Sequence, residues 1–423
     1  MAEKVIITGV TQNQPNFDYS MTELGELAKA NHYEVVGRMD QGLDRPIGAT
    51  YFGSGKVEEI AEYAQAMDAP TIIVNDELSP SQLRNLEKLT KRHVMDRTQL
   101  ILEIFANRAQ SKTAKMQVEI AQLQYALPRL HPSANKLDQQ GGGGGFANRG
   151  AGETKLEMDR RILTKRIARL RHELKEEDIG EEVRRAQRDK QALPMVALVG
   201  YTNAGKSTTM NGLLELFADH PETKQVFEKD MLFATLDTSV RQITLPDKRK
   251  FLLSDTVGFV SKLPHHLVKS FKATLAEAAK ADLLIQVVDY ADPNYKEMMA
   301  VTEKTLKDIG VENIPMIEAY NKADLREGTS FPEVNGQQIV YSARDTASLE
   351  KLVEVIKHHV FADEETHQYL IPFDQGSVVS FINQETAVQA TEYVEAGTLI
   401  TTTVNPVQAG QLRRFLVEAP VTE

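Results

Sequence analysis

The sequence predicts an α/β protein in which a phosphate-loop domain is joined to three smaller parts. Two stretches alternate strand-like apolar runs with helical patterns, and two helical stripes flank a run of glycines. One complete phosphate-loop pattern stands between a strand-like run and a helical run. We therefore expect an N-terminal α/β domain, a helical hairpin linker with a glycine-rich loop, the phosphate-loop domain and a small C-terminal α+β domain. Their expected boundaries are residues 1–97, 98–193, 194–362 and 363–423.

The composition is that of a globular protein, since 41% of the 423 residues are hydrophobic and 26% are charged. The lack of cysteine excludes disulfides, thiolate metal sites and a cysteine nucleophile. No apolar run approaches the roughly 20 residues of a membrane span, and the start MAEKVIITGV lacks an export signal. We expect a cytoplasmic monomer without a membrane span.

Positive charge is concentrated in one part of the chain. Residues 97–190 hold 19 Lys or Arg against 13 Asp or Glu, a net charge of +6 in a chain whose total is −11. Such asymmetry indicates either a nucleic-acid-binding face or a solvated helix with many salt bridges. Charge alone favours the salt-bridged helix.

The N-terminal domain is predicted from four strand-like runs separated by three helical patterns. The runs lie at residues 5–10, 34–38, 71–75 and 91–96, and the helices at 21–31, 57–67 and 80–90. A GSGK tetrapeptide at 53–56 is not a phosphate loop, because Val57 follows the lysine and Thr50 stands where the first glycine is needed. We interpret it as a turn before a helix.

The hairpin is predicted from two apolar stripes with identical steps of four, three and four residues. The stripes are Met116, Ile120, Leu123 and Leu127, then Leu163, Ile167, Leu170 and Leu174. Two such helices bury their stripes most simply by packing antiparallel. The five glycines at 141–145 are either a plain linker or a tip whose backbone approaches RNA closely, with Asn148 and Arg149 as donors.

The last two domains are predicted from further strand-like runs. In the phosphate-loop domain the runs lie at residues 195–199, 250–253, 283–289, 316–320 and 338–341. In the C-terminal domain, residues 378–382 and 398–404 are predicted strands, and one helix is expected near 408–417.

The segment GYTNAGKS matches the whole phosphate-loop pattern. It comprises Gly200, Tyr201, Thr202, Asn203, Ala204, Gly205, Lys206 and Ser207. The glycines let the chain wrap so that successive N–H groups and the next helix N-terminus face phosphate oxygens. Lys206 supplies a charge to the β and γ phosphates, and the Ser207 hydroxyl can coordinate Mg²⁺.

A second motif, DTVG, follows the strand-like run at 250–253. It comprises Asp255, Thr256, Val257 and Gly258. Asp255 can hold Mg²⁺ through water, and the Gly258 amide can sense a γ phosphate. Alone, the motif is weak evidence for a nucleotide site, and it becomes stronger evidence because it follows the phosphate loop in the sequence.

Two further segments indicate the base. NKAD comprises Asn321, Lys322, Ala323 and Asp324, and SAR comprises Ser342, Ala343 and Arg344. The Asp324 carboxylate can accept from both N1–H and the amino group of guanine, a pair that adenine lacks. Asn321 can bond N7 and brace the phosphate loop, the Lys322 stem can cover the base, and the Ala343 N–H can donate to guanine O6.

The four motifs in this order resemble the translation-factor-like GTPases, and LFATLD followed by DTVGF narrows the resemblance to HflX-type GTPases. GKVEEI at 55–60 and RGAGETKLEMDRRIL at 149–163 also resemble that family's N-terminal and linker signatures. The resemblance covers most of residues 1–365. It implies a GTPase that converts GTP and water to GDP and phosphate.

The resemblance also implies a switch segment at FATLD, with residues Phe233, Ala234, Thr235, Leu236 and Asp237. The Thr235 hydroxyl would complete the Mg²⁺ coordination begun by Ser207, and Thr238 is the rival candidate. The implied catalytic residues are Lys206, Thr235 and Gly258.

Two positions suggest special chemistry. Phe259 stands where many switch GTPases have a water-orienting Gln, so a partner or another residue must orient the nucleophile. Asn203 is similar to the asparagine of GTPases that use K⁺ beside the phosphates, although a turn-stabilising role is slightly favoured.

The resemblance implies a partner, the large ribosomal subunit with its ribosomal RNA, and a role in ribosome splitting or rescue under stress. A signalling module that acts on a protein partner and a biogenesis factor of the large subunit are the alternatives.

Overall fold

The computed structural model describes residues 2–12, 16–130, 147–189, 193–217, 233, 239–262, 278–311 and 313–417, with side chains in the long helix α6 described from 155 to 177. By their contacts, the residues form two compact units. The first consists of Met1–Gln187, Lys229–Asp237 and Gly258–Thr274, and the second of Arg188–Glu228, Thr238–Val257 and Leu275–Glu423. Two short segments of the predicted phosphate-loop domain therefore have their contacts in the first unit.

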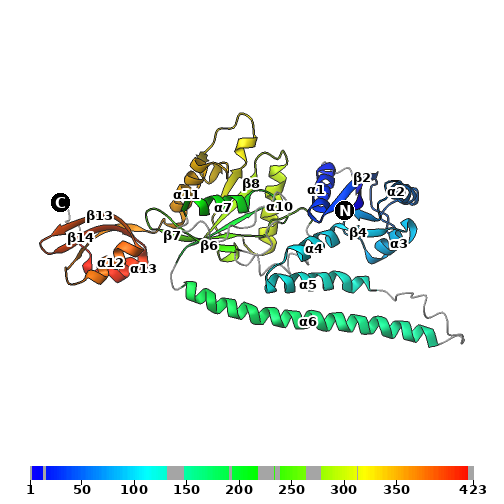
Figure 1. Cartoon of the computed structure of the whole chain (residues 1–423), viewed down its shortest axis with the longest axis horizontal. Coiled ribbons are helices and arrows are strands. Elements are labelled where there is room, and N and C mark those ends of the chain that lie inside the picture. Colours follow the sequence, from blue (N-terminus) through cyan, green and yellow to red (C-terminus); the bar gives the residue numbers. More distant parts are fainter. Residues whose placement is uncertain are drawn as a thin grey trace. The chain divides into compact units, whose positions relative to one another are not determined.

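The first unit begins with a four-stranded parallel sheet in the order β2-β1-β3-β4. Its strands are β1 (Glu3–Thr11), β2 (Tyr33–Gly42), β3 (Thr71–Val74) and β4 (His93–Asp96), and its helices are α1 (Phe17–Ala30), α2 (Ser54–Ala66), α3 (Pro80–Thr90) and α4 (Arg97–Arg108). Helix α1 contacts α4, and α2 contacts α3, on the two faces of the sheet (Figure 1). All four predicted strands and all three predicted helices are confirmed. The GSGK segment is not a turn before the helix as predicted: Gly53 is the N-cap of α2, and Ser54, Gly55 and Lys56 form its first turn.

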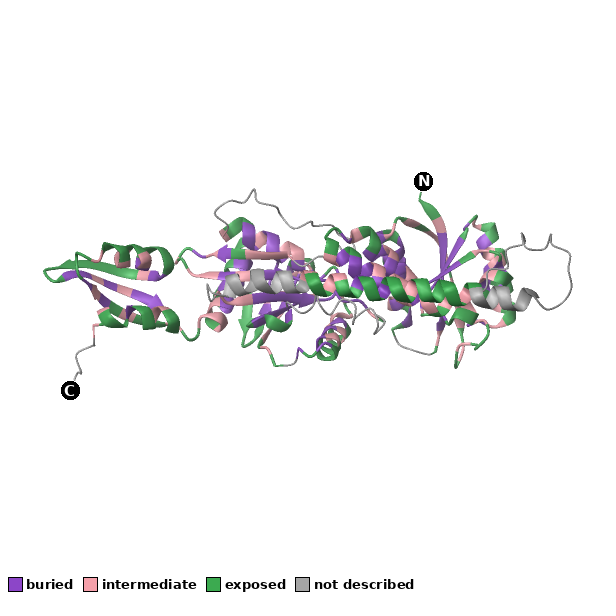
Figure 2. Ribbon diagram, turned by 90° about the horizontal axis from the view of Figure 1, so that it is seen from below, coloured by how far each residue is buried: buried purple, intermediate pink, exposed green. Residues whose placement is uncertain are grey.

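The predicted antiparallel hairpin is formed by α5 (Lys112–Ala126) and α6 (Ala147–Asp189), with η1 (Leu127–Arg129) after α5. Its apolar seam consists of Met116, Ile120, Ile167 and Leu170, flanked by Leu123 and Leu174. Ion pairs join Lys112 to Glu177 and Arg166 to Glu119, so residue numbers rise on one helix as they fall on the other. The rest of the described surface of α6 is largely exposed (Figure 2).

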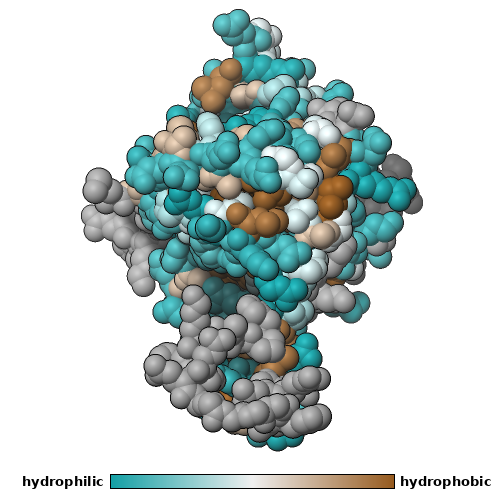
Figure 3. Space-filling model, turned by 90° about the vertical axis from the view of Figure 1, so that its right-hand side faces the viewer, coloured by the Kyte–Doolittle hydropathy of each residue, from teal (hydrophilic) through white to brown (hydrophobic). Residues whose placement is uncertain are grey.

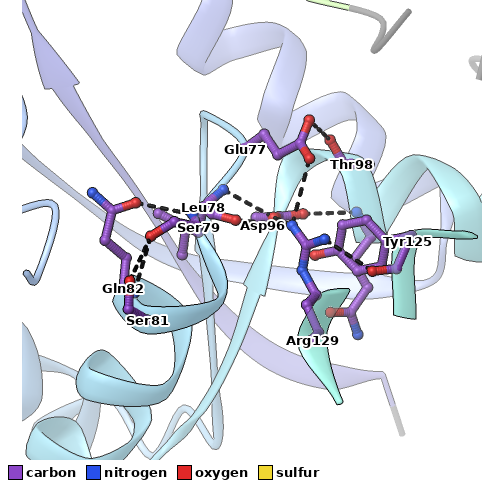
Figure 4. Close-up of polar contacts among 10 residues, drawn as sticks. Glu77, Leu78, Ser79, Ser81, Gln82, Asp96, Thr98, Tyr125 and Arg129 are labelled. Atoms are coloured by element: carbon purple, nitrogen blue, oxygen red, sulfur yellow. Dashed lines mark hydrogen bonds and ion pairs between the residues drawn. The ribbon is translucent and has the colours of Figure 1, made fainter. Parts of the chain in front are cut away.

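A buried polar cluster ties the end of α5 to the sheet (Figure 4). Asp96 caps α4 by accepting from the Gln99 N–H at 2.8 Å, and it also accepts from the Leu78 N–H at 3.0 Å. Arg129 lies 3.4 Å from the same carboxylate, and its guanidinium stacks 3.5 Å from the Tyr125 ring centroid. Burial raises the pKa of Asp96 above its usual range, while the backbone donors and the guanidinium oppose the shift.

The second unit contains a seven-stranded sheet in the order β10-β11-β9-β8-β5-β7-β6, parallel except at the outer pairs β10–β11 and β6–β7. Its strands are β5 (Met195–Gly200), β6 (Ser239–Thr244), β7 (Lys250–Asp255), β8 (Leu283–Asp289), β9 (Met316–Asn321), β10 (Glu333–Asn335) and β11 (Gln338–Val340). Its helical segments are α7 (Lys206–Phe217), η3 (Ala278–Lys280), α10 (Tyr295–Asp308), η4 (Ala323–Leu325) and α11 (Thr346–Val360). The apolar strands β5 and β8 are buried almost throughout, as their near-continuous hydrophobic runs require, whereas buried and half-buried residues alternate along β9.

The C-terminal segment forms an antiparallel sheet in the order β12-β14-β13. Its elements are β12 (Glu365–Ile371), α12 (Gly376–Glu385), β13 (Ala387–Val394), β14 (Gly397–Val404), α13 (Pro406–Leu412) and η5 (Arg413–Phe415). The predicted strand at 378–382 is wrong, because these residues lie in α12. Val378, Val379, Phe381 and Ile382 pack on the core of this sheet, and that packing overrides their local strand preference. The predicted strand at 398–404 is confirmed.

The described helices include none that is both long enough and apolar enough to cross a bilayer. The face of the N-terminal sheet domain seen in Figure 3 is mostly hydrophilic and carries small apolar patches.

Candidate nucleotide-binding and hydrolysis site

The phosphate loop joins β5 to α7 at the carboxyl edge of the central sheet, and both of its glycines are required by their positive φ angles and by close neighbouring atoms. Gly200 has φ +144°, and a Cβ there would lie 2.3 Å from the Val287 carbonyl oxygen. Gly205 has φ +95°, and a Cβ there would lie 2.1 Å from the Asn321 Nδ2. Any larger residue would force the loop away from β8 or from Asn321.

The loop turns at Asn203, which has φ +62° and an exposed side chain. Asparagine tolerates this left-handed conformation better than most residues. The geometry therefore agrees with the turn-stabilising role.

Lys206 opens α7 and is buried within the loop. Its Nζ donates to the Tyr201 carbonyl at 2.7 Å and to the Gly200 carbonyl at 3.1 Å. Burial lowers the pKa of Lys206 to about 8, and the Asp255 carboxylate opposes this shift. A phosphate group would restore the charged form, because an anion next to the ammonium compensates its desolvation.

The predicted Mg²⁺ residues of the loop and of β7 lie together. The Ser207 Oγ donates to Asp255 Oδ2 at 2.7 Å, and Asp255 is fully buried at the end of its strand. Beside it, Thr256 is buried and donates from Oγ1 to the Leu198 carbonyl at 2.7 Å. A hydroxyl and a carboxylate beside a phosphate-binding loop fit Mg²⁺, which is usually held by one or two such groups together with phosphates and water. Among the described residues, no cluster of three or more His, Asp or Glu forms a separate metal site.

Asn321 joins the phosphate loop to the SAR segment. At the end of β9 its Nδ2 donates to the Ala204 carbonyl at 2.9 Å, and its Oδ1 accepts from the Ala343 N–H at 2.8 Å. The predicted brace to the phosphate loop is thus present. The Ala343 N–H, which we expected to donate to guanine O6, is directed at Asn321 because that buried amide needs a donor for its oxygen.

The NKAD and SAR segments lie at neighbouring strand ends. Lys322 is in the left-handed region at φ +63°, and its Nζ pairs with Asp289 Oδ2 at 2.7 Å. Asp324 is exposed on η4, beyond buried Ala323. Ser342 is buried and its Oγ accepts from the Arg344 N–H at 3.3 Å. This arrangement leaves the Asp324 carboxylate accessible to a base.

Sequence reasoning missed a cation and a carboxylate beside this loop. Asp289 ends β8 and fixes Lys322, and Arg326 stacks 4.0 Å from the Tyr290 ring centroid. The signal for Asp289 is its position at the carboxyl end of a buried strand, where ligand sites of parallel sheets form. Nothing in the local sequence marks Arg326.

The switch residues are only partly described. Val257 and Gly258 follow Asp255 and Thr256, and Phe259 beyond them is 2% exposed. Phe233 is buried and stacks edge-to-face on Phe105 with centroids 4.6 Å apart. The predicted residues Ala234, Thr235, Leu236 and Asp237, and the rival Thr238, lie outside the described residues.

A phosphate loop with a buried lysine, a strand-end aspartate beside its serine and a guanine-type loop braced by asparagine define a GTPase of the phosphate-loop class. Three family models match in succession: the GTP-binding GTPase N-terminal model at residues 18–106, the GTP-binding GTPase middle region at 108–188 and the 50S ribosome-binding GTPase model at 195–322.

Curated relatives extend the match to nearly the whole chain. GTPase HflX of Caldanaerobacter subterraneus is 39% identical over 98% of this chain and 94% of its own, and GTPase HflX of Escherichia coli K12 is 35% identical over 94% and 92%. The chain belongs to the HflX family of GTPases and hydrolyses GTP. Among solved structures, a GTP-binding protein from Sulfolobus solfataricus in complex with GDP is 24% identical, covering 85% of this chain and 99% of that one with a TM-score of 0.45.

Proposed function

We propose that the GTP-bound protein binds the large ribosomal subunit through its RNA, promotes ribosome splitting or rescue under stress, and leaves after hydrolysis. The observation that carries this proposal is an exposed cationic face on α6. Arg160, Arg161, Lys165 and Arg171 are all exposed, and within the described residues no carboxylate pairs with them. In contrast, Arg166 and Arg169 on the same helix are paired with Glu119 and Glu173. The salt-bridged helix therefore explains only part of the charge, and unpaired cations on one helix suit phosphate contacts.

The four predicted parts have separate tasks in this proposal. The N-terminal domain (1–97) and the hairpin (98–193) contact ribosomal RNA, and the GTPase domain (194–362) times the interaction. The C-terminal domain (363–423) has no assigned task. The protein acts as a monomer in the cytoplasm.

Hydrolysis proceeds by in-line attack of water on the γ phosphate. The Lys206 ammonium neutralises charge on the β and γ phosphates, and the Gly258 N–H donates to a γ-phosphate oxygen. Mg²⁺, held by Ser207, by Thr235 and through water by Asp255, would neutralise charge between the same phosphates. Asp324 accepts two hydrogen bonds from guanine and selects GTP over ATP.

Phe259 does not orient the attacking water, because its side chain is apolar and buried. Intrinsic hydrolysis is therefore slow, and the bound partner completes the site, a contribution worth about 10³ to 10⁵ in rate in other GTPases. K⁺ bound near Asn203 is a second proposed contributor. Equal hydrolysis rates in KCl and NaCl would remove K⁺ from the proposal.

Cosedimentation with purified large subunits tests the ribosomal role. Binding is expected with a non-hydrolysable GTP analogue and is expected to weaken with GDP. The test variant changes Arg160, Arg161, Lys165 and Arg171 to Gln. The matched control changes four exposed lysines of the GTPase domain, Lys280, Lys296, Lys304 and Lys307.

Each lost phosphate contact lowers the slope of log affinity against log salt by about 1, so the α6 variant should lose up to about 4 and the control none. Binding that ignores the nucleotide contradicts the switch. Binding that ignores salt favours the alternative of an apolar protein partner. Binding to immature particles alone favours the biogenesis alternative.

A further inference from the structure

The N-terminal sheet has a topological switch point of the kind that binds ligands in other parallel α/β proteins. The chain leaves β1 toward β2 on one side, and β3 is paired on the other side of β1. In open parallel sheets, ligands bind outside the carboxyl ends of the strands at this position. The carboxyl ends of β1 and β3 are therefore the place to look for a ligand of this domain.

Buried polar side chains gather near the carboxyl ends of β3 and β4. Arg97, directly after β4, pairs with Glu23 of α1, and the two side chains are 1% and 4% exposed. The Arg97 Nη1 also donates to Asn75 Oδ1 at 3.0 Å, and Asn75 Nδ2 donates to Ser20 Oγ at 2.9 Å. A buried ion pair adds little stability by itself, and buried charges at the carboxyl edge of a sheet are more typical of a binding site.

The segment that follows the DTVG motif contacts these polar side chains. The Arg97 Nη2 donates to the Ser261 carbonyl at 3.2 Å and to Ser261 Oγ at 3.0 Å, and the Ser261 hydroxyl donates to Glu23. Next to it, Lys262 Nζ pairs with Asp76 Oδ1 at 2.6 Å, and Asp76 follows β3 by two residues. Both partners of the buried ion pair thus bind one serine.

Phe233, the described residue of the predicted FATLD switch segment, has its contact in the same unit. Phe233, just before the predicted Mg²⁺ threonine, stacks on Phe105 of α4, the helix that Arg97 begins. The compact unit that contains the N-terminal domain accordingly includes Lys229–Asp237 and Gly258–Thr274.

We propose that the Arg97–Glu23 pair is a docking site for Ser261 of the same chain, and that it makes Arg97 and Glu23 positioning residues for the GTPase reaction. Ser261 lies three residues beyond Gly258, and three residues span at most about 11 Å. A displacement of Gly258 toward a γ phosphate therefore pulls on the docked serine. The docking of Ser261 opposes that displacement, so it raises the affinity for GDP relative to GTP. GTP binding in turn weakens the docking of Ser261.

The proposal rests on the proposed contact between Gly258 and the γ phosphate, and not on the ribosomal role. The test measures the affinities of the full-length protein for a non-hydrolysable GTP analogue and for GDP. In Ser261→Ala the preference for the analogue should rise by about 10-fold, which corresponds to about 1.4 kcal/mol. Lys262→Ala, which loses the pair with Asp76, should shift the preference in the same direction by less, because that pair is partly exposed.

Ser81→Ala and Lys280→Ala are the matched controls. Ser81 is an exposed serine of the same domain whose hydroxyl contacts Ser79, and Lys280 is an exposed lysine of the GTPase domain. Both should leave the preference unchanged. A merely structural role of Ser261 would lower the melting temperature and change both affinities together, without changing their ratio.

Gly258→Pro, which removes the backbone N–H proposed to donate to the γ phosphate, separates the two possible failures. If this variant keeps the wild-type preference for the analogue, the contact of Gly258 with the γ phosphate is wrong. If Gly258→Pro loses the preference while Ser261→Ala keeps or lowers it, the docking proposal alone is overturned. Hydrogen exchange of α1 and the start of α4 gives an independent measurement. Protection should fall when the analogue replaces GDP in the wild type, and an unchanged pattern also overturns the proposal.

Discussion

Replacing Asn321 with alanine should damage the nucleotide site and the stability of its domain together. The side chain is 2% exposed and supplies both a donor, to the Ala204 carbonyl, and an acceptor, for the Ala343 N–H. These two partners belong to the phosphate loop and to the SAR segment, which are 139 residues apart and meet through this one amide.

The expected loss of free energy in Asn321→Ala follows from the two backbone groups that lose their partner. Alanine leaves a buried carbonyl and a buried N–H without their partner, and each orphaned group costs about 1–3 kcal/mol. The total is about 2–6 kcal/mol. Part of it reduces the free energy of unfolding, and the remainder appears as a weaker nucleotide affinity, because the loop loses its fixed shape. GTP and GDP should lose affinity equally, since both use the phosphate loop and the base loop.

Chemical denaturation measures the loss in the free energy of unfolding, and calorimetric titration with GDP and a GTP analogue measures the loss in nucleotide affinity. Asn383→Ala is the control, because Asn383 is exposed on α12 and its backbone carbonyl makes the described contact with Lys248. A fall in affinity for the GTP analogue with unchanged stability and unchanged GDP affinity would refute the brace, because it would assign Asn321 to the γ phosphate instead.

Three further outcomes follow from the site and from the polar cluster at α5. Asp324→Ala removes two hydrogen bonds to a carboxylate, each worth about 1.5–3 kcal/mol, so titration should show GTP affinity lower by about 10² to 10⁴ and no change for ATP. GTP affinity should be constant below pH 8 and fall by up to about tenfold per pH unit above it. The reason is that the pKa of Lys206 is about 8 in the free protein and that phosphate binds the protonated form. Lys206→Arg should show no such dependence of GTP affinity on pH, because arginine stays protonated. Arg129→Met should destabilise the first unit by up to about 3–5 kcal/mol by leaving the Asp96 carboxylate without its cation. Because the raised pKa of Asp96 makes its charged form unfavourable in the folded protein, this loss should be larger at pH 8 than at pH 5 in denaturation measurements, and the reverse order would contradict it.

The parts of the fold that the sequence predicts are those with strong local signals. The phosphate loop is recognisable because the local geometry admits only glycine at two positions. A Cβ at Gly200 would lie 2.3 Å from the Val287 carbonyl oxygen, and a Cβ at Gly205 would lie 2.1 Å from the Asn321 Nδ2. The hairpin is recognisable because the 3.6-residue period selects the side chains of its seam. The strand predicted at 378–382 failed because a β-branched run packs equally well as a helix when a neighbouring sheet supplies the core.

The sequence does not reveal contacts that depend on tertiary placement. Glu23 and Arg97 stand in ordinary helical patterns, 74 residues apart, and nothing local indicates that their charges are buried together. The bond from Ala343 to Asn321 likewise needs β9 and β11 to lie side by side. Motif reasoning assigned Ala343 to the base because it considered each loop alone, whereas a buried amide must satisfy its oxygen and its nitrogen within the fold.

The nucleotide-binding motifs do not all have their contacts in the same compact unit. The phosphate loop and the NKAD and SAR segments have their contacts in the second unit, whereas Lys229–Asp237 and Gly258–Thr274 have theirs in the first unit. In the docking proposal, a ligand that draws the Gly258 segment to its γ phosphate acts against the Arg97–Glu23 site. A partner that loosens this site would raise the affinity for GTP, and by thermodynamic reciprocity GTP would raise the affinity for that partner by the same factor. A proposed RNA contact with the first unit that loosens the docking would therefore change the nucleotide preference without contacting the nucleotide.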